Sequence, residues 1–518
     1  MPINALRGIV GKVSLIHLLV CVVLLGLPGC RLPCLRSPEA GPALPGDFGG
    51  KITAENSAHA GVYDFFDDPV LTDLLTNGLS QNQELKIRNQ ELQIAANQIM
   101  ARRGAYFPFV TVGAGGGVGR NSRFTPLGAA EDQLTYPGGG NFPSPLTNAG
   151  LSANMFWNVD IWRQLRNSRD AAQIRYCEAV EARNYLVTKL VAETAEKYYE
   201  LAALDKKLEF LNQTIAIQQQ SLDVAKNLKE NARGTELSVQ RFLAEVRKNE
   251  SQRLIVRQKI IETENRINFL AGRFPQPVNR INWDAITLDS RTLQVGIPAQ
   301  LMQNRRDIRA AELEVAASGL DVRVARANFY PKLVITAGVG YEAFNTKYLF
   351  DPEALVTNAA GQLVAPLINR AAIRAEYLSA NARQLQAVYN YQRTVLNAFT
   401  EVTNSVNKVE NYRESVQIKY EEVKALETSV TVARSFFQAP LEEEFAKVQY
   451  VDVLLATRDL LDARTSLLET KQQQLAGIVN AYQSLGGGYL LTSDGNEYAE
   501  LFYVPQEDGE PEEPSDMP

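Results

Sequence analysis

The fold is decided by a stretch that the chain contains twice: ELQIAANQIMARRGAYFPFVTVGAGGG at residues 91–117 and ELEVAASGLDVRVARANFYPKLVITAGVG at residues 312–340. The copies align with an offset of 223 residues, which pairs Pro108 with Pro331. Each copy predicts a helix, an aromatic pair, a proline and a glycine-rich strand, because proline removes a helix donor and fixes φ. A two-copy internal repeat therefore organises the chain.

Two stretches in these copies alternate in polarity. In 333–341 every second residue, from Leu333 to Tyr341, is apolar, and 151–162 alternates in the same way. Strands of about 10 residues with one apolar face suit a transmembrane β-barrel wall, and an ordinary soluble hairpin is the alternative. The segments 120–149 and 342–362 are expected to be exposed loops. If the strands span a membrane, both loops face the cell exterior.

Each copy supplies two such strands, which is too few for a closed barrel. A single-chain bacterial barrel needs about 8 strands or more, and an open strand edge is not viable in lipid. The barrel must therefore be shared between copies of the chain, which predicts an obligate homo-oligomer.

Each copy also contains one long predicted helix, at 163–231 and 369–436, where apolar residues recur every three or four positions. At 1.5 Å per residue each spans about 100 Å. Shorter helices are predicted before the strands and after the long helices, at 81–105, 235–272, 303–328 and 446–485. In each copy the two shorter helices, stacked end to end, nearly equal the long one. We therefore expect a closed oligomer to form a long hollow helical cylinder capped by a β-barrel.

The N-terminus reads as a targeting segment. Positive charges precede an apolar run over 13–27, as in a bacterial signal peptide. The run ends in LPGC at 27–30, which resembles a lipobox, so cleavage before Cys30 would leave a thiol for lipidation. Pro28 is unusual in such a box, and an ordinary signal peptide cleaved nearby is the alternative. Arg31 stands where Asp would favour retention in the inner membrane, so an outer-membrane destination is expected.

Composition excludes several kinds of site. The net charge is −6 with no basic block, which argues against nucleic acid as a partner. His17 and His59 are the only histidines, which rules out a His-rich metal site. The four cysteines fit neither a zinc site nor a disulfide framework. Without a nucleophile–His pair, a phosphate loop or a metal cluster, we expect no enzyme, no catalytic residue and no cofactor.

The residues resemble the outer membrane efflux protein family, the TolC-like outer membrane factors, and more closely its lipoprotein branch of the NodT type. The resemblance covers roughly 63–490. It is carried by the two repeats and by five further segments: DFFDDPVLTDLLTNGLSQNQEL at 64–85, FWNVDIWRQLRNSRDAA at 156–172, NFLAGRFP at 268–275, LVAPLINRAAIRA at 363–375 and VLNAFTEVTNSV at 395–406.

The resemblance implies a mainly α fold with a transmembrane β part. It implies a homotrimer in which a 12-stranded β-barrel, four strands per chain, sits on a long α-helical barrel that crosses the periplasm. Members of the family join a periplasmic adaptor (a membrane fusion protein) and an inner-membrane pump, here of the RND type. The expected function is the outer-membrane channel of a tripartite efflux system, anchored to outer-membrane lipid. A duct of a type I protein secretion system and a structural coiled-coil envelope lipoprotein are the alternatives.

The resemblance also points to an aperture. VDVLLAT at 451–457 is similar to the family's motif after the periplasmic helix turn, where two acidic residues one turn apart ring the narrowest point. Asp452 matches the first acidic position, and Leu455 departs from the second. Three copies of Asp452 at the axis would attract cations, whereas a solvated helix-end carboxylate is the alternative.

A second acidic group is expected at the same tip of the molecule. Glu442, Glu443 and Glu444 follow Pro440 in a run that departs from the family. They would add to an acidic tip, or else form a solvated turn that places acids at a helix N-terminus.

The expected domain organisation follows the repeat. It comprises a signal peptide (1–29), a lipid-anchored N-terminal segment (30–63), a first outer-membrane-factor repeat (64–280), a second repeat (281–490) and an acidic, disordered tail (491–518). The transported substrate cannot be read from the sequence, because in such systems the pump chooses most of the cargo.

Overall fold

The computed structural model describes residues 32–53, 55–137, 139–232, 234–286, 288, 293–366, 370–438 and 450–488. The chain divides into two compact units. The sheet unit contains Ala95–Arg175 and Glu314–Tyr389 together with the start of the described chain. The helical unit contains Ala40–Ile94, Tyr176–Leu313 and the chain from Asn390 onward. Cys30, Glu442, Glu443, Glu444 and the tail after 488 lie outside the described residues.

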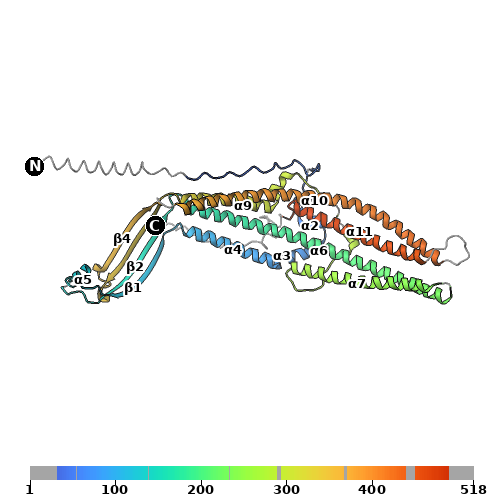
Figure 1. Cartoon of the computed structure of the whole chain (residues 1–518), viewed down its shortest axis with the longest axis horizontal. Coiled ribbons are helices and arrows are strands. Elements are labelled where there is room, and N and C mark those ends of the chain that lie inside the picture. Colours follow the sequence, from blue (N-terminus) through green and yellow to red (C-terminus); the bar gives the residue numbers. More distant parts are fainter. Residues whose placement is uncertain are drawn as a thin grey trace, which may run out of the picture. The chain divides into compact units, whose positions relative to one another are not determined.

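The predicted internal repeat is present in the order of the elements (Figure 1). In each copy a helix leads into two strands, a long helix and a returning helix. The first copy comprises α4 (Gln83–Gly104), β1 (Phe109–Gly119), β2 (Leu146–Val159), α6 (Gln164–Glu230) and α7 (Glu236–Leu270). The second comprises α9 (Arg306–Ala327), β3 (Lys332–Ala343), β4 (Leu355–Val364), α10 (Ala371–Gln438) and α11 (Tyr450–Ser484).

Short elements fill the connections. They are η1 (Ser57–His59), α2 (Val62–Phe66), α3 (Pro69–Gln81), α5 (Pro126–Glu131), η2 (Trp283–Ala285), η4 (Pro298–Gln300), α8 (Leu301–Asn304), η5 (Thr346–Tyr348) and η6 (Pro352–Ala354). Several begin with a side-chain cap: Asp68, for example, accepts hydrogen bonds from the amides of Val70 and Leu71 at the start of α3.

The strands form one antiparallel sheet in the order β1–β2–β3–β4. Neighbouring strands pair along almost their whole length, with Ala153 opposite Val112 on one side and Val339 on the other. Within the described residues β1 and β4 each pair with one neighbour and are the edges of the sheet.

The predicted end of one strand was wrong. The stretch 151–162 was expected to alternate to its end, but β2 stops at Val159. Asp160 is buried and accepts hydrogen bonds from the amides of Leu165 and Arg166, both at 3.0 Å, so it caps the start of α6 instead of continuing the strand.

The two predicted loops were also longer than the observed ones. The segment 342–362 contains the end of β3, two short 3₁₀ helices and most of β4, because LVTNAAGQLV pairs with β3 although its polar and small residues resemble a loop. The segment 120–149 contains α5 and the first residues of β2.

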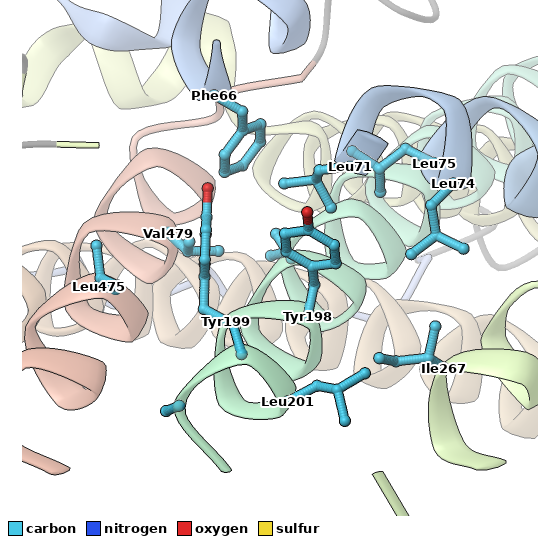
Figure 2. Packing of buried hydrophobic residues seen from close by; sticks show 14 of the residues in the cluster. Phe66, Leu71, Leu74, Leu75, Tyr198, Tyr199, Leu201, Ile267, Leu475 and Val479 are labelled. Carbon is cyan, nitrogen blue, oxygen red and sulfur yellow. The ribbon is translucent and has the colours of Figure 1, made fainter. Parts of the chain in front are cut away.

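The core of the helical unit lies where α6 meets the short helices and the returning helices (Figure 2). Tyr198, Tyr199 and Leu201 of α6 are almost fully buried there. They pack with residues from α2, α3, α7 and α11, among them Phe66, Leu71, Leu74, Leu75, Ile267, Leu475 and Val479. Fully burying one such side chain contributes about 1.5–3 kcal/mol, so this cluster fastens several helices around α6.

The predicted end-to-end stacking of the shorter helices is confirmed at two joints in the helical unit. At the first, the side chain of Asn82, beside α4, donates to the carbonyl of Leu270, the last residue of α7, at 2.8 Å. At the second, Arg305, beside α9, donates to the carbonyl of Ser484, the last residue of α11, at 3.2 Å. Each joint satisfies a helix-end carbonyl that would otherwise lack a partner.

Candidate functional site

The sheet has two chemically different faces. Leu151 lies opposite Tyr341, and Trp157 lies opposite Ile335. The apolar residues of β2 and those of β3 therefore lie on the same face of the sheet. The apolar face carries Val110, Val112, Ala114, Val118, Leu151, Ala153, Met155, Trp157, Val159, Leu333, Ile335, Ala337, Val339, Tyr341, Leu355, Ala359 and Leu363, with Thr147 and Thr357 as polar exceptions.

Large side chains on the apolar face are exposed in the single chain. Val112 is 74% exposed, Leu363 67% and Val339 50%. A soluble protein seldom leaves an apolar surface of this extent open, so this face needs an apolar environment.

The opposite face, termed the polar face, is rich in glycine and asparagine, and its large apolar residues are Phe109, Leu146, Phe156, Val334, Val356 and Val364. One row crosses the sheet through Thr111, Asn154, Gly338 and Asn358, which lie opposite one another in register. A β-carbon at Gly338 would lie 2.7 and 2.8 Å from the amide oxygens of Asn358 and Asn154, so any other residue there would displace these two side chains. Around this row the face is hollowed by about 440 Å³.

Aromatic residues mark the helix-side end of the strands. The indole of Trp157 donates to the carbonyl of Tyr106 at 3.0 Å, and that of Trp162 donates to the carbonyl of Pro331 at 2.7 Å. Trp162 also stacks on Tyr330, with ring centroids 4.8 Å apart. Tryptophan and tyrosine with an apolar body and a hydrogen-bonded polar edge are typical of a membrane–water interface.

Asp452 lies in the first turn of α11 and is exposed. Leu455, which departs from the family's second acidic position, lies on the same helix and is 36% exposed. The expected acidic residues Glu442, Glu443 and Glu444 and the expected lipidation site Cys30 lie outside the described part of the chain.

Within the described ranges, no group of three or more His, Cys, Asp or Glu side chains could hold a metal ion. Of the helices in those ranges, none combines the length and apolarity that a membrane crossing requires.

The sequence profile of the family described as "Outer membrane efflux protein" matches residues 74–273 and 297–487. The chain belongs to this family. The two matched ranges each contain one copy of the helix–strand–strand–helix repeat. Family membership confirms the predicted function at its coarser level, an outer-membrane channel for efflux.

Two efflux proteins match almost the whole chain. The cation efflux system protein CusC of Escherichia coli (strain K12) is 23% identical over 477 residues, which are 91% of this chain and 99% of that protein. The probable efflux pump outer membrane protein TtgC of Pseudomonas putida (KT2440) is 25% identical over 506 residues, 94% of this chain and 98% of that protein.

The fold is shared with solved structures. The CmeC outer membrane channel of Campylobacter jejuni superposes with a TM-score of 0.75 at 17% identity, over 90% of this chain and 96% of that chain. The fold class predicted from the sequence, mainly helical with four strands per chain and a twofold internal repeat, is thereby confirmed.

Sequence reasoning missed the polar row and the buried arginine of the second joint. Glycine occupies every second position of β1, at 113, 115, 117 and 119, which matches the alternating polar positions of β2. This signal could have assigned β1 to the same polar face from the sequence. Nothing in the sequence alone places Asn154 opposite Gly338 or buries Arg305, because both depend on register and packing between distant segments.

Proposed function

We propose that three copies of this chain form an outer-membrane efflux channel, with the four-stranded sheet of each copy supplying one third of a 12-stranded barrel. The observation that supports it best is the sheet itself: one apolar face, one polar face and two edge strands, β1 and β4. In lipid each edge must pair, and pairing β1 of one copy with β4 of the next closes the ring. The apolar face then meets lipid and the polar face lines the channel.

Lipidation at Cys30 fits the start of the described chain. Leu32 and Leu35 pack against the cluster that contains Phe329 and Tyr377, next to the first residue of β3. Leu32, the first described residue, therefore lies at the helix-side end of the strands, where a lipid anchor is expected. Radiolabelled palmitate should label the wild type and a Cys34→Ser control, and should not label a Cys30→Ser variant. Labelling of Cys30→Ser would refute the anchor.

The partners are a periplasmic adaptor and an inner-membrane pump, which would engage the turns that follow α6 and α10. CusC and TtgC bear names that place them in efflux systems, which supports this assignment. The pump supplies the energy, and this chain conducts passively and catalyses no reaction. Near the α6–α7 turn, Lys229 pairs with Glu236 and Thr235 caps α7.

Asp452 is proposed to line the aperture of the closed channel. Its position in the first turn of α11 and its exposure leave it accessible for such a role. Docking of the adaptor would open the aperture by a small untwisting of the helices.

The deciding experiment is single-channel conductance of the purified protein in a planar bilayer, with oligomeric mass measured on the same sample. A trimer with small, cation-preferring currents is expected, because a duct without its partners is mostly closed. A non-conducting species that is not a trimer would overturn the proposal and favour a structural coiled-coil lipoprotein.

A further inference from the structure

The tips of the two strand hairpins enclose an aromatic hollow. Tyr136 and Phe142 come from the β1–β2 connection, and Phe344 and Tyr348 from the β3–β4 connection. Phe344 is central, with its ring centroid 5.1 Å from that of Tyr136, 5.1 Å from that of Phe142 and 5.5 Å from that of Tyr348. We call this space, of about 490 Å³, the tip hollow. Its volume is that of a site for a drug-sized molecule.

The charged residues that line the tip hollow are acidic. Glu342, Asp351 and Glu353 contribute carboxylates, and none of the described residues that line the hollow is lysine or arginine. Glu342 is held in place by Asn148, whose side-chain amide donates to it at 2.7 Å. Lys347 is close by, with its ammonium 5.7 Å from the Tyr348 ring centroid, but it does not line the hollow. The hollow therefore combines aromatic faces with negative charge.

The tip hollow continues onto the polar face of the sheet. Asn148 and Glu342 line both the tip hollow and the hollow around the row of Asn154 and Gly338. A solute that moves along the polar face would reach the aromatic cluster as it leaves. This placement at the exit of the channel rests on the proposed function, whereas the hollow itself does not.

We propose that the tip hollow binds aromatic organic cations. Aromatic side chains contact the rings of such a ligand in stacked or edge-to-face geometry, and their faces attract its positive charge. The carboxylates of Glu342, Asp351 and Glu353 add attraction for a cation and repel an anion of the same shape. The exit of the channel then holds this class of solute briefly before release to the exterior.

The test is equilibrium binding, by titration calorimetry, to the full-length protein in detergent. Tetraphenylphosphonium is the probe, and tetraphenylborate, an anion of nearly the same size and shape, is its matched control. We expect the cation to bind about one site per chain at least about tenfold more tightly than the anion. Equal affinity of the two ions would overturn the proposal.

Variants assign the binding to the hollow. Glu342→Gln and Phe344→Ala should each weaken tetraphenylphosphonium binding about five- to tenfold. Glu131→Gln is the control for the first, because Glu131 also accepts a hydrogen bond from an asparagine amide, that of Asn121, but lies outside the hollow. Phe350→Ala is the control for the second, since Phe350 is an exposed aromatic of the same connection outside the lining. Wild-type affinity in Glu342→Gln would overturn the proposal even if Phe344→Ala fails to fold.

Failure of this inference and failure of the proposed function give different results. Binding is measured without a membrane, so a protein that binds the cation but does not conduct refutes only the channel. A protein that conducts but binds both ions alike, or binds neither, refutes only the tip hollow.

Discussion

Arg305 and Glu401 form an ion pair beside the joint between α11 and α9, with a guanidinium nitrogen 2.7 Å from a carboxylate oxygen of the 42% exposed Glu401 side chain. Arg305 is 2% exposed, pairs also with Asp307 at 2.6 Å and donates to the carbonyl of Ser484. Burial opposes its charge, yet these hydrogen bonds and the two carboxylates raise the pKa of Arg305 overall. One side chain thus links α10 to the ends of α9 and α11.

Replacing Arg305 with Met should destabilise the helical unit by about 1–3 kcal/mol, because it leaves the carbonyl of Ser484 without its donor and the largely buried Asp307 without its cation. Denaturant unfolding of the purified protein, monitored by circular dichroism, measures the effect. The matched control is Arg458→Met, which breaks an ion pair with Asp459 whose side chains are 44% and 48% exposed. It should cost at most about 1 kcal/mol, and equal losses in the two variants would contradict the argument.

The two faces of the sheet predict opposite outcomes for neighbouring residues. Ala153→Arg puts a charge on the apolar face and should cost about 2–4 kcal/mol near the middle of the membrane. We expect the heat-modifiable oligomer to be lost from outer-membrane extracts. Asn154→Arg puts the same charge on the polar face, so the oligomer should form and its cation preference should fall in bilayers. Assembly of both variants would mean that the apolar face does not meet lipid.

The close approach of β2 and β3 at Gly340 leads to a further prediction. A β-carbon there would lie 2.5 Å from the carbonyl oxygen of Leu151, so Gly340→Ala must shift the β2–β3 pairing. The control is Gly361→Ala, because a β-carbon at Gly361 meets nothing within 4 Å. We expect a loss of thermal stability of about 1–3 kcal/mol for the first and little change for the second. The temperature at which the oligomer dissociates on gels gives the comparison.

The sequence predicted most of the helical part, and the reason is physical. Proline-free stretches with apolar residues at helical spacing determine α6 and α10 locally, so their predicted ends lie within about two residues of the observed ones. The matching lengths of the shorter helices were enough to predict the end-to-end joints.

The sheet was harder to predict. β4 has polar or small residues at many positions and is a strand because β3 pairs with it. This pairing cannot be predicted from the local sequence of β4. Asp160 fits the alternating polar positions of β2 in the sequence, but in the structure it caps α6. The tip hollow depends on two connections about 200 residues apart in the sequence, and the contact between the rings of Tyr136 and Phe344 forms only in the folded chain.

Alkaline pH should weaken the core around α6. Burial raises the pKa of Tyr199, with nearby Asp68 adding to the effect. Below pH 10 this phenol is neutral in both states. As pH rises through about 10 it ionises in the unfolded chain while the fold keeps it neutral, so the free energy of unfolding falls by up to about 1.4 kcal/mol per pH unit. Tyr199→Phe should flatten this loss between pH 10 and 11.

Unfolding midpoints measured from pH 8 to 11 check this prediction. Tyr420→Phe is the control, because Tyr420 is 60% exposed and lies outside the core cluster. A wild-type slope in Tyr199→Phe would show that other groups cause the alkaline loss.

The proposed aperture predicts a change of ion selectivity without a change of assembly. Asp452→Asn removes one carboxylate per chain and therefore three from the axis of a trimer, so cation preference should fall by on the order of twofold. The reversal potential across a salt gradient in a planar bilayer measures it. Asp462→Asn is the matched control, since Asp462 is another exposed carboxylate of α11. Asp452 would have no part in the aperture if both variants kept the wild-type reversal potential, because any carboxylate at the narrowest point must act on passing ions.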